Sequence, residues 1–164
     1  MNPLFDINET CCFTGHRAIA ANLQPKVSVC VEETIKMLID KGVTTFISGG
    51  AIGYDMLAAS IVLRLKSKYP QIRLIMALPC KDQHVKWASS IQQSYRHILS
   101  CADEIIYLSE KYCTGCMHLR NRFMVDNSSV CVAYMTHRTG GTAYTVNYAA
   151  EKGVEIINIA YLIT

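Results

Sequence analysis

Short apolar runs alternate along the chain with longer stretches in which apolar residues recur every three or four positions. The short runs are typical of buried β-strands, and the periodic stretches are typical of amphipathic helices. Strands are predicted over residues 10–14, 43–48, 72–78, 104–108, 129–135 and 154–159. Helices are predicted over residues 25–41, 54–68, 83–101, 117–127 and 142–152.

Strands that alternate with helices of this length form parallel βαβ units, with helices on both faces of an open sheet. The strands are almost entirely apolar, as expected for parallel strands that are buried on both faces. Right-handed crossovers leave few topologies for such a chain. We therefore predict an α/β fold, a Rossmann-like three-layer α/β/α sandwich in a single domain over residues 1–164. Its mostly parallel sheet is expected in the strand order 3-2-1-4-5-6.

The composition agrees with one globular domain. The chain has 164 residues, of which 51% are hydrophobic and 18% are charged. Such a composition excludes intrinsic disorder, and apolar runs this short exclude a transmembrane helix of about 20 residues. The net charge of +3 permits an anionic ligand but is far from that of a dedicated nucleic-acid coat.

The N-terminus lacks the basic region, the long apolar region and the small-residue cleavage site of a signal peptide. We therefore expect a cytoplasmic protein whose eight cysteines are reduced. Cys113 and Cys116 form the one CxxC pair. A structural zinc site needs a second ligand pair at suitable spacing, and none follows, so we expect no metal and a loop that opens a helix.

Polar residues and glycines gather after particular strands. Four strands of the predicted sheet are followed by such segments: Gly15-His16-Arg17 after the first, 48–55 after the second, Lys111, Tyr112, Gly115, Arg120 and Asn121 after the fourth, and 137–142 after the fifth. In the predicted order these strands are neighbours, so their loops meet at the carboxyl edge of the sheet. Ligands of open α/β sheets bind in the crevice at that edge, here expected between strands one and four.

Glycines that join a strand to a helix let a ligand approach the backbone, and the helix N-terminus then favours an anion such as phosphate. The segment 48–55 supplies one such junction and Gly140-Gly141-Thr142 supplies a second. Arg17, Arg120 and Arg138 can add bidentate contacts to phosphate or carboxylate. The NAD fingerprint is absent because strand three has no acidic residue at its end, and no GxxxxGK[ST] loop exists.

The sequence thus predicts a pocket for a small phosphorylated ligand such as a nucleoside phosphate. The predicted ligand-binding residues are Gly15, His16, Arg17, Ser48, Gly49, Gly50, Gly53, Asp55, Arg120, Asn121, Gly140, Gly141 and Thr142. Structural interpretations remain open beside this one. A glycine turn is often only a tight connection, His16 can serve in packing, and Asp55 can complement a helix dipole.

Four segments together resemble the SLOG superfamily, which groups the Smf/DprA DNA-processing proteins with LOG-type phosphoribohydrolases. The segments are Cys12-Phe-Thr-Gly-His-Arg17, Phe46-Ile-Ser-Gly-Gly-Ala-Ile-Gly-Tyr-Asp55, Met117-His-Leu-Arg-Asn-Arg-Phe-Met-Val-Asp126 and Gly140-Gly-Thr-Ala-Tyr-Thr145. The resemblance covers the chain in order and is strongest to the YpsA-like branch of small stand-alone domains. It implies a Rossmann-like fold and a pocket for a nucleotide or a nucleotide-derived ligand, for example one like ADP-ribose.

The chain departs from the LOG-type hydrolases at one position. Those enzymes carry a GGxGTxxE motif whose glutamate takes part in breaking an N-glycosidic bond, and Asn147 stands at that place here. An amide cannot act as a carboxylate base, and Glu151, one helical turn further on, is a weak substitute.

Three hypotheses follow. The first is a ligand-binding domain that acts as a sensor or carrier. The second is a nucleoside 5′-monophosphate phosphoribohydrolase (an N-glycosidase) that uses Asp55 or Glu151 as acid or base. The third is DprA-like binding of single-stranded DNA, which the modest charge of +3 disfavours. The wide apolar face with Ile61, Val62 and Leu65 also predicts a homo-oligomer as an alternative to burial.

Overall fold

A computed structural model describes residues 5–163, so the first four residues of the N-terminal stretch and residue 164 lie outside the description. Within this part of the chain the strands form one six-stranded sheet in the order β4-β3-β2-β1-β5-β6, and every neighbouring pair is parallel. The strands are β1 (Thr10–Gly15), β2 (Thr45–Ser48), β3 (Arg73–Leu78), β4 (Glu104–Tyr107), β5 (Val130–Tyr134) and β6 (Glu155–Asn158).

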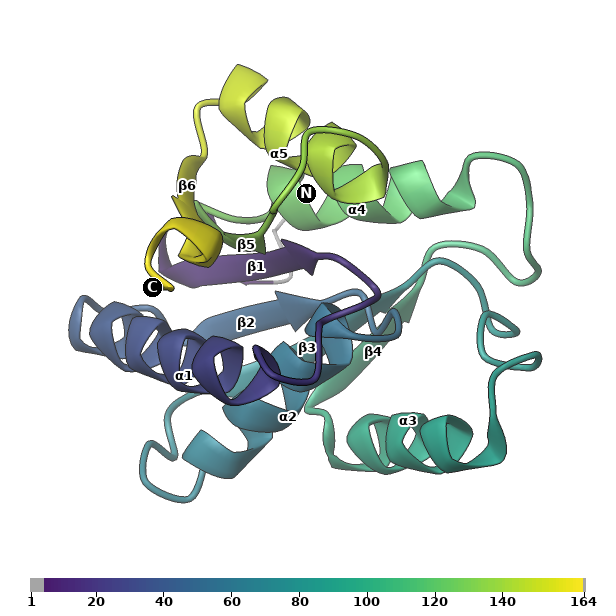
Figure 1. Cartoon of the computed structure of the whole chain (residues 1–164), viewed down its shortest axis with the longest axis horizontal. Coiled ribbons are helices and arrows are strands. Elements are labelled where there is room, and N and C mark those ends of the chain that lie inside the picture. Colours follow the sequence, from purple (N-terminus) through teal and green to yellow (C-terminus); the bar gives the residue numbers. More distant parts are fainter. Residues whose placement is uncertain (1–4, 164) are drawn as a thin grey trace.

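Helices cover both faces of the sheet (Figure 1). One face carries α1 (Gln24–Asp40), α2 (Tyr54–Leu65) and α3 (Ser89–Cys101), and the other carries α4 (Cys116–Asp126) and α5 (Gly141–Glu151). Short 3₁₀ helices, η1 (Ile7–Glu9) and η2 (Ile159–Tyr161), lie near the two ends of the described chain. The predicted class, a Rossmann-like α/β fold with helices on both faces, is confirmed.

Alternate residues of β1, β2, β3 and β5 enter two separate hydrophobic cores, because successive side chains of a strand point to opposite faces. Phe13 and Phe46 belong to the core beneath α1, α2 and α3, where their rings stack at 6.1 Å. Cys12 and Ile47 belong to the core beneath α4 and α5. Tyr54 is fully buried, and its hydroxyl donates a hydrogen bond to the Val132 carbonyl oxygen at 3.0 Å, which ties α2 to β5.

The position of β4 differs from the order 3-2-1-4-5-6. The runs β3-β2-β1 and β5-β6 occur as expected, but β4 pairs with β3 at the edge instead of lying between β1 and β5. A right-handed crossover that keeps its helix on one face always moves in one direction along the sheet. Because α3 lies beside α2 on the same face, the chain takes one more step away from β1 before it reverses. The reversal therefore places β5, and not β4, beside β1.

The third helix is shorter than predicted. It begins at Ser89, and residues 83–88 form turns, although the apolar spacing continues through them. His84 and Trp87 pack their rings on Tyr95, with centroids 4.9 and 5.1 Å away. Aromatic side chains of the turn therefore contact α3 from outside the helix, whereas Val85, which continues the apolar spacing in the sequence, is 57% exposed.

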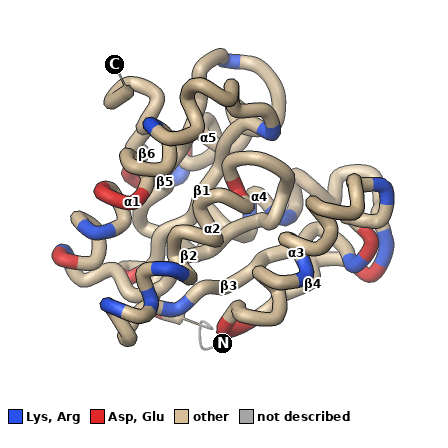
Figure 2. Tube along the Cα trace, turned by 60° about the horizontal axis from the view of Figure 1, so that its bottom comes forward, with Lys and Arg blue, Asp and Glu red and all other residues tan. Residues whose placement is uncertain are grey.

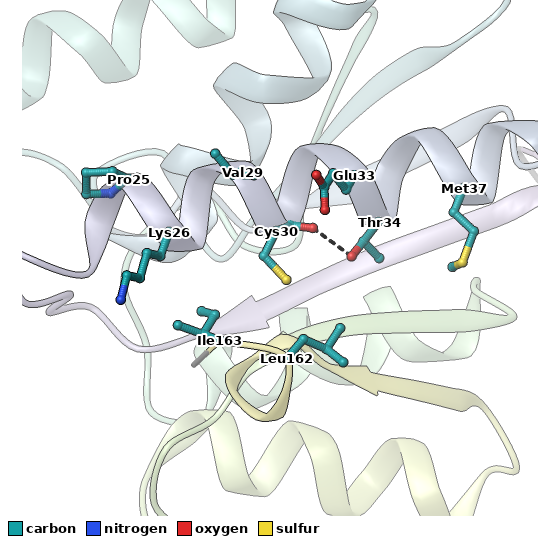
Figure 3. A pocket seen from close by; sticks show the side chains of 9 residues that line it. All are labelled: Pro25, Lys26, Val29, Cys30, Glu33, Thr34, Met37, Leu162 and Ile163. Carbon is teal, nitrogen blue, oxygen red and sulfur yellow. Dashed lines mark hydrogen bonds between the residues drawn. The ribbon is translucent and has the colours of Figure 1, made fainter.

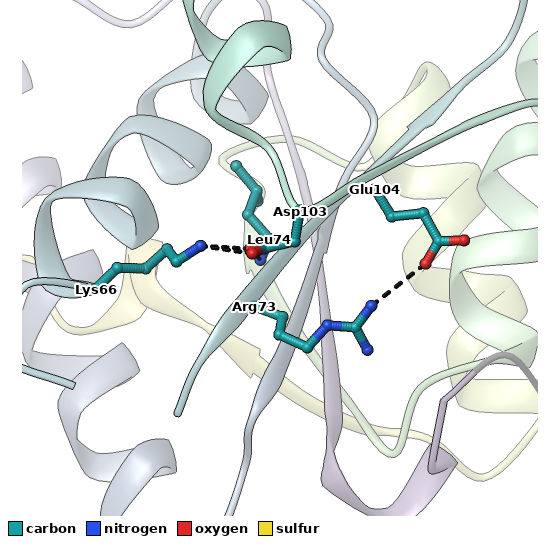
Figure 4. A network of polar contacts seen from close by, with 5 residues as sticks. All are labelled: Lys66, Arg73, Leu74, Asp103 and Glu104. Carbon is teal, nitrogen blue, oxygen red and sulfur yellow. Dashed lines mark hydrogen bonds and ion pairs between the residues drawn. The ribbon is translucent and has the colours of Figure 1, made fainter. Parts of the chain in front are cut away.

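Two ion pairs hold the edge formed by β3 and β4 (Figure 4). The Lys66 ammonium lies 2.6 Å from the Asp103 carboxylate, which also accepts the backbone N–H of Leu74 at 2.7 Å. The more exposed pair joins Arg73 to Glu104 at 3.4 Å. Asp103 precedes β4 directly, so its bonds fix the edge strand against β3.

The apolar face of α2 is covered within the molecule itself. Ile61, Val62 and Leu65 are 1%, 0% and 3% exposed, and they pack in the core between α2 and the sheet. Burial therefore explains the width of this face, and the face gives no reason to expect a homo-oligomer. None of the helices over residues 5–163 is long and apolar enough to cross a membrane.

Candidate functional site

A cavity of about 240 Å³ lies at the carboxyl edge of the sheet. It is lined by Thr14, Gly15, His16, Arg17, Ala51, Asp55, Met117, Arg120, Asn121, His137, Thr139, Gly140, Gly141 and Thr142. Apart from Thr14 and Met117, these residues belong to the four polar segments that the sequence singled out. The cavity occupies the switch point of the sheet, where chain connections leave neighbouring strands in opposite directions. In the observed order this point lies between β1 and β5, which corrects the expected place between strands one and four.

Helix α4 brings its residues to the cavity although β4 lies at the far edge of the sheet. The chain crosses back over the sheet on its way to β5, and Met117, Arg120 and Asn121 reach the cavity from the first two turns of α4. The loop before α4 does not reach the cavity. The backbone N–H of Tyr112 donates to the Asp82 carboxylate at 3.1 Å, and neither Tyr112 nor Lys111 lines the cavity.

The N-terminus of α5 faces the cavity with open hydrogen-bond donors. Gly140 precedes the helix with φ +89°, and no side chain caps the first turn. The N–H groups of Gly141, Thr142 and Ala143 therefore have no partner inside the helix. The first turn of α5 also contains no acidic residue. This helix end is consequently available to an anion, which the helix dipole favours.

Arg120 is held rigidly although it is charged. Only 4% of the residue is exposed, and its guanidinium donates to the Gly49 carbonyl oxygen and, through Nε, to the Asn121 Oδ1 at 2.8 Å. A Cβ atom at Gly49 would collide with this guanidinium. Gly49 is therefore a glycine because Arg120 occupies the space where a side chain would lie. The residue positions the arginine and does not itself line the cavity.

Three other predicted residues of the 48–55 segment also shape the cavity without lining it. The Ser48 hydroxyl donates to the Asp55 carbonyl oxygen at 2.9 Å and accepts the Gly50 N–H at 3.2 Å. Gly50 has φ +69°, and its missing side chain faces the core. Gly53 has φ +88° and abuts the carbonyl of Arg17. None of Ser48, Gly50 and Gly53 lines the cavity, so their part in the site is to shape the turn before α2.

Asp55 brings a carboxyl group into this otherwise cationic cavity. The residue is 6% exposed. Burial raises the pKa of Asp55 from 3.8 to about 6, although Arg120, the backbone N–H of Ala51 and Arg17 lower it. A carboxyl group with such a pKa exchanges its proton close to neutral pH, which is the property of a general acid or base.

His16 connects β1 to the loop after β5. Its Nε2 accepts the backbone N–H of Thr136 at 2.9 Å, so the ring is neutral and carries its proton on Nδ1. The ring stacks on His137, with centroids 4.1 Å apart and planes inclined by 4°. Burial, and then the neighbouring His137, lower the pKa of His16. The pair holds the 135–140 loop against the cavity.

Four residues that the sequence singled out lie apart from the cavity. Arg138 borders a separate hollow with Met135 and Tyr161. Glu151 is exposed at the last position of α5, at the opposite end from Gly141, which removes its case as an acid or base. Cys113 is exposed and Cys116 is buried at the start of α4. Over residues 5–163 no group of three or more His, Cys, Asp or Glu side chains could hold a metal ion.

A wider hollow of about 710 Å³ lies along α1 (Figure 3). Its walls are residues of α1, from Pro25 to Met37, together with Leu162 and Ile163. No residue from the strand-end loops contributes to it. Its largely apolar lining distinguishes this hollow from the cationic cavity at the carboxyl edge of the sheet.

The fold and the cavity define a Rossmann-like α/β protein whose strand-end loops surround one cationic crevice. The chain belongs to the YspA SLOG family, whose model matches residues 11–162, so the resemblance seen in the four motifs is confirmed. It is 32% identical over 141 residues to YoqJ, an uncharacterized SPbeta prophage-derived protein of Bacillus subtilis, covering 79% of this chain and 81% of YoqJ.

A second relative and one solved structure are also similar to this chain. A UPF0398 protein of Halalkalibacterium halodurans is 29% identical over 124 residues, which cover 74% of this chain and 66% of that protein. The structure of DNA processing protein A from Helicobacter pylori, described for its single-stranded DNA binding mode, superposes with a TM-score of 0.64 at 19% identity. That match covers 90% of this chain but only 63% of the H. pylori chain, and it shows a shared fold.

Proposed function

We propose that this protein binds a small phosphorylated, nucleotide-derived molecule in the cavity at the carboxyl edge of the sheet and acts as a sensor or carrier. One observation carries the proposal. Segments far apart in sequence converge on a single cavity that combines the open N–H groups of α5 with Arg17 and Arg120. Phosphate oxygens are the ligand that helix N-termini and arginines bind together most often.

Hydrogen bonds within the protein already hold the buried arginine of the cavity in place for an anion. Arg120 already bonds to Gly49 and Asn121, so little side-chain freedom is lost when it binds a ligand. Arg17 is exposed at the rim and has no hydrogen bond or ion pair to any residue in 5–163, so it is free to close on a phosphate. A volume of about 240 Å³ suits a phosphate with its attached sugar.

Isothermal titration against nucleotides, ADP-ribose and cyclic dinucleotides tests the proposal. Arg17→Gln should weaken binding of the best ligand by about tenfold, the effect of roughly 1.4 kcal/mol. Arg96 on α3 is exposed and bonds only to Gln92 among the described residues, so Arg96→Gln is the matched control and should bind as the wild type does. No binding of any ligand at high protein concentration overturns the proposal.

Asp55 supports a second candidate function, hydrolysis of the N-glycosidic bond of a nucleoside 5′-monophosphate. It is a buried carboxyl group in the same cavity as Arg120, with a pKa of about 6. Chromatography of free base released from adenosine monophosphate tests this activity. Asp55→Asn should abolish the release and Glu151→Gln should leave it intact. Equal traces from the wild type and from Asp55→Asn exclude the hydrolase.

Single-stranded DNA binding has less support in this chain. The likeness to the H. pylori protein rests on a shared fold. Lys and Arg are scattered along the trace and interspersed with Asp and Glu (Figure 2), whereas strand binding uses a continuous basic groove with stacking aromatics. A steep fall in oligonucleotide affinity with rising salt would favour this alternative.

The cytoplasmic location also remains a prediction, which the eight free cysteines support.

A further inference from the structure

We infer that the ligand is bipartite, and that a second cavity beside the first receives an uncharged, flat heterocycle such as a nucleobase. The inference rests on the proposed function, since it assigns the other half of the same ligand. The second cavity has a volume of about 620 Å³. It is lined by Arg17, Ala18, Ile19, Gln24, Ile52, Gly53, Met56, Leu57, Ser90, Ile91 and Ser94.

The two cavities meet at Arg17, which lines both of them. Both cavities take residues from the 15–18 segment and from the first turn of α2, because these two parts of the chain pack directly on each other. The Tyr54 N–H donates to the His16 carbonyl oxygen at 3.1 Å, and Gly53 leaves no room for a side chain against Arg17. A ligand whose phosphate lies at Gly141 and Thr142 can therefore extend past the Arg17 side chain into the second cavity.

The lining of the second cavity suits a heterocycle better than a second phosphate. Ile19, Met56, Leu57 and Ile91 give it aliphatic walls, and Arg17 is its only charged residue. Flat rings with apolar faces pack on such walls, while their edges require hydrogen bonds.

Suitable partners for those edges are present. Within residues 5–163, the Gln24 amide and the Ser90 hydroxyl have no hydrogen-bond partner, and the Ser94 hydroxyl has only a weak one, the Ser90 carbonyl oxygen at 3.3 Å. Each of the three lies in the lining of the second cavity. The cavity therefore offers apolar contact to the faces of a ring and polar contact to its edge.

The space continues beyond the second cavity. A further hollow of about 520 Å³ shares Met56, Leu57 and Ser94 with it and extends between α2 and α3. The hollow between α2 and α3 therefore continues beyond the second cavity and leaves room for a ring larger than one base. The anion cavity is smaller, at about 240 Å³.

Ser94→Trp fills the second cavity without disturbing the core, because Ser94 is exposed on α3. Ser100→Trp is the matched control, since Ser100 is also exposed on α3 but does not line the cavity. The probes are ribose 5-phosphate, which occupies only the anion cavity, and adenosine 5′-monophosphate, which adds the base.

Calorimetry with the wild type should give an affinity for adenosine 5′-monophosphate at least about tenfold above that for ribose 5-phosphate. Ser94→Trp should reduce the nucleotide to the affinity of the sugar phosphate and leave the sugar phosphate unchanged, while Ser100→Trp behaves as the wild type. In NMR spectra the nucleotide alone should shift the methyl signals of Met56 and Ile91, and both ligands should shift the amide of Thr142.

Equal affinities of the two probes for the wild type overturn the inference and leave the proposed function standing. The same holds if Ser94→Trp weakens the sugar phosphate as much as the nucleotide. Failure of the wild type to bind either probe overturns the inference, and the proposed function falls as well if no nucleotide, ADP-ribose or cyclic dinucleotide of the wider panel binds.

Discussion

The guanidinium of Arg120 donates a hydrogen bond to the carbonyl oxygen of Gly49, a residue 71 positions earlier in the chain. This bond connects α4, on one face of the sheet, to the turn that follows β2 and leads into a helix on the other face. A buried charge requires such bonded partners to be tolerated. The bond thus both stabilises the arginine and directs it towards the cavity.

Gly49→Ala should displace Arg120 and weaken ligand binding, because the new methyl group would collide with the guanidinium. Overpacking of this kind costs about 1–3 kcal/mol of stability, measurable by urea unfolding. Gly141→Ala is the control for stability, since a Cβ atom there meets nothing within 4 Å. An unchanged unfolding midpoint for Gly49→Ala would contradict the contact.

Asp55→Asn should stabilise the protein at pH 8. The folded-state pKa of Asp55 is about 6, above its ordinary 3.8, so the folded protein holds the proton more tightly than the unfolded chain. The stabilisation that protonated Asp55 contributes is then fully present below about pH 4. It is lost as the pH rises through about 6, which lowers the free energy of unfolding by up to ~3 kcal/mol. Thermal unfolding should show a higher midpoint for Asp55→Asn at pH 8 and little difference near pH 4. A lower midpoint at pH 8 would mean that the ionised form is favoured.

His16→Ala should loosen the loop after β5. The substitution removes the acceptor of the Thr136 N–H and the ring stacked on His137. Hydrogen exchange at the Thr136 amide should therefore accelerate, while the amide of Val132 in the buried strand keeps its protection.

In the wild type, low pH should loosen the loop after β5 in the same way as His16→Ala does. The pKa of His16 is lowered in the folded state, so this stabilisation is complete above about pH 6.5 and is lost as pH falls through the folded pKa. Protection of the Thr136 amide that does not change with pH or on mutation would rule out this role.

Asp103→Asn should destabilise the protein more than Glu104→Gln does. Burial raises the pKa of Asp103, but the Lys66 ammonium and the Leu74 N–H outweigh it and lower the pKa below its usual value. Loss of such charge-assisted bonds costs about 1.5–3 kcal/mol, whereas an exposed pair such as Arg73–Glu104 contributes about 0–1 kcal/mol. Urea unfolding of both variants gives the comparison, and equal losses would refute it.

Gly141→Asp should raise stability and lower ligand affinity together. A carboxylate in the first turn of α5 interacts favourably with the helix dipole, by about 0.3–1 kcal/mol, but it occupies the place expected for the phosphate. Glu151→Gln, at the other end of the same helix, should leave the affinity unchanged within about twofold. Calorimetry and thermal unfolding of the two variants test this, and unimpaired binding by Gly141→Asp would place the anion elsewhere.

The sequence predicts the βαβ alternation well, because buried parallel strands and amphipathic helices leave distinct apolar periods. It also brings Arg17, Asp55 and Gly141 to one edge, since carboxyl ends of parallel strands share an edge. It does not place β4, because the direction of each crossover depends on which face its helix covers. Nor does the sequence distinguish the roles of the two glycines: Gly49 makes room for an arginine, whereas Gly141 faces the cavity.

The pairing of β1 with β5 joins Cys12 to Cys131 in register, so one side of β1 stays unpaired until β5, Val130–Tyr134, has been synthesised. An open strand edge is a template for wrong partners. Nascent chains that end before Val130 should therefore bind chaperones and aggregate readily, and they should acquire neither the completed sheet nor the anion cavity.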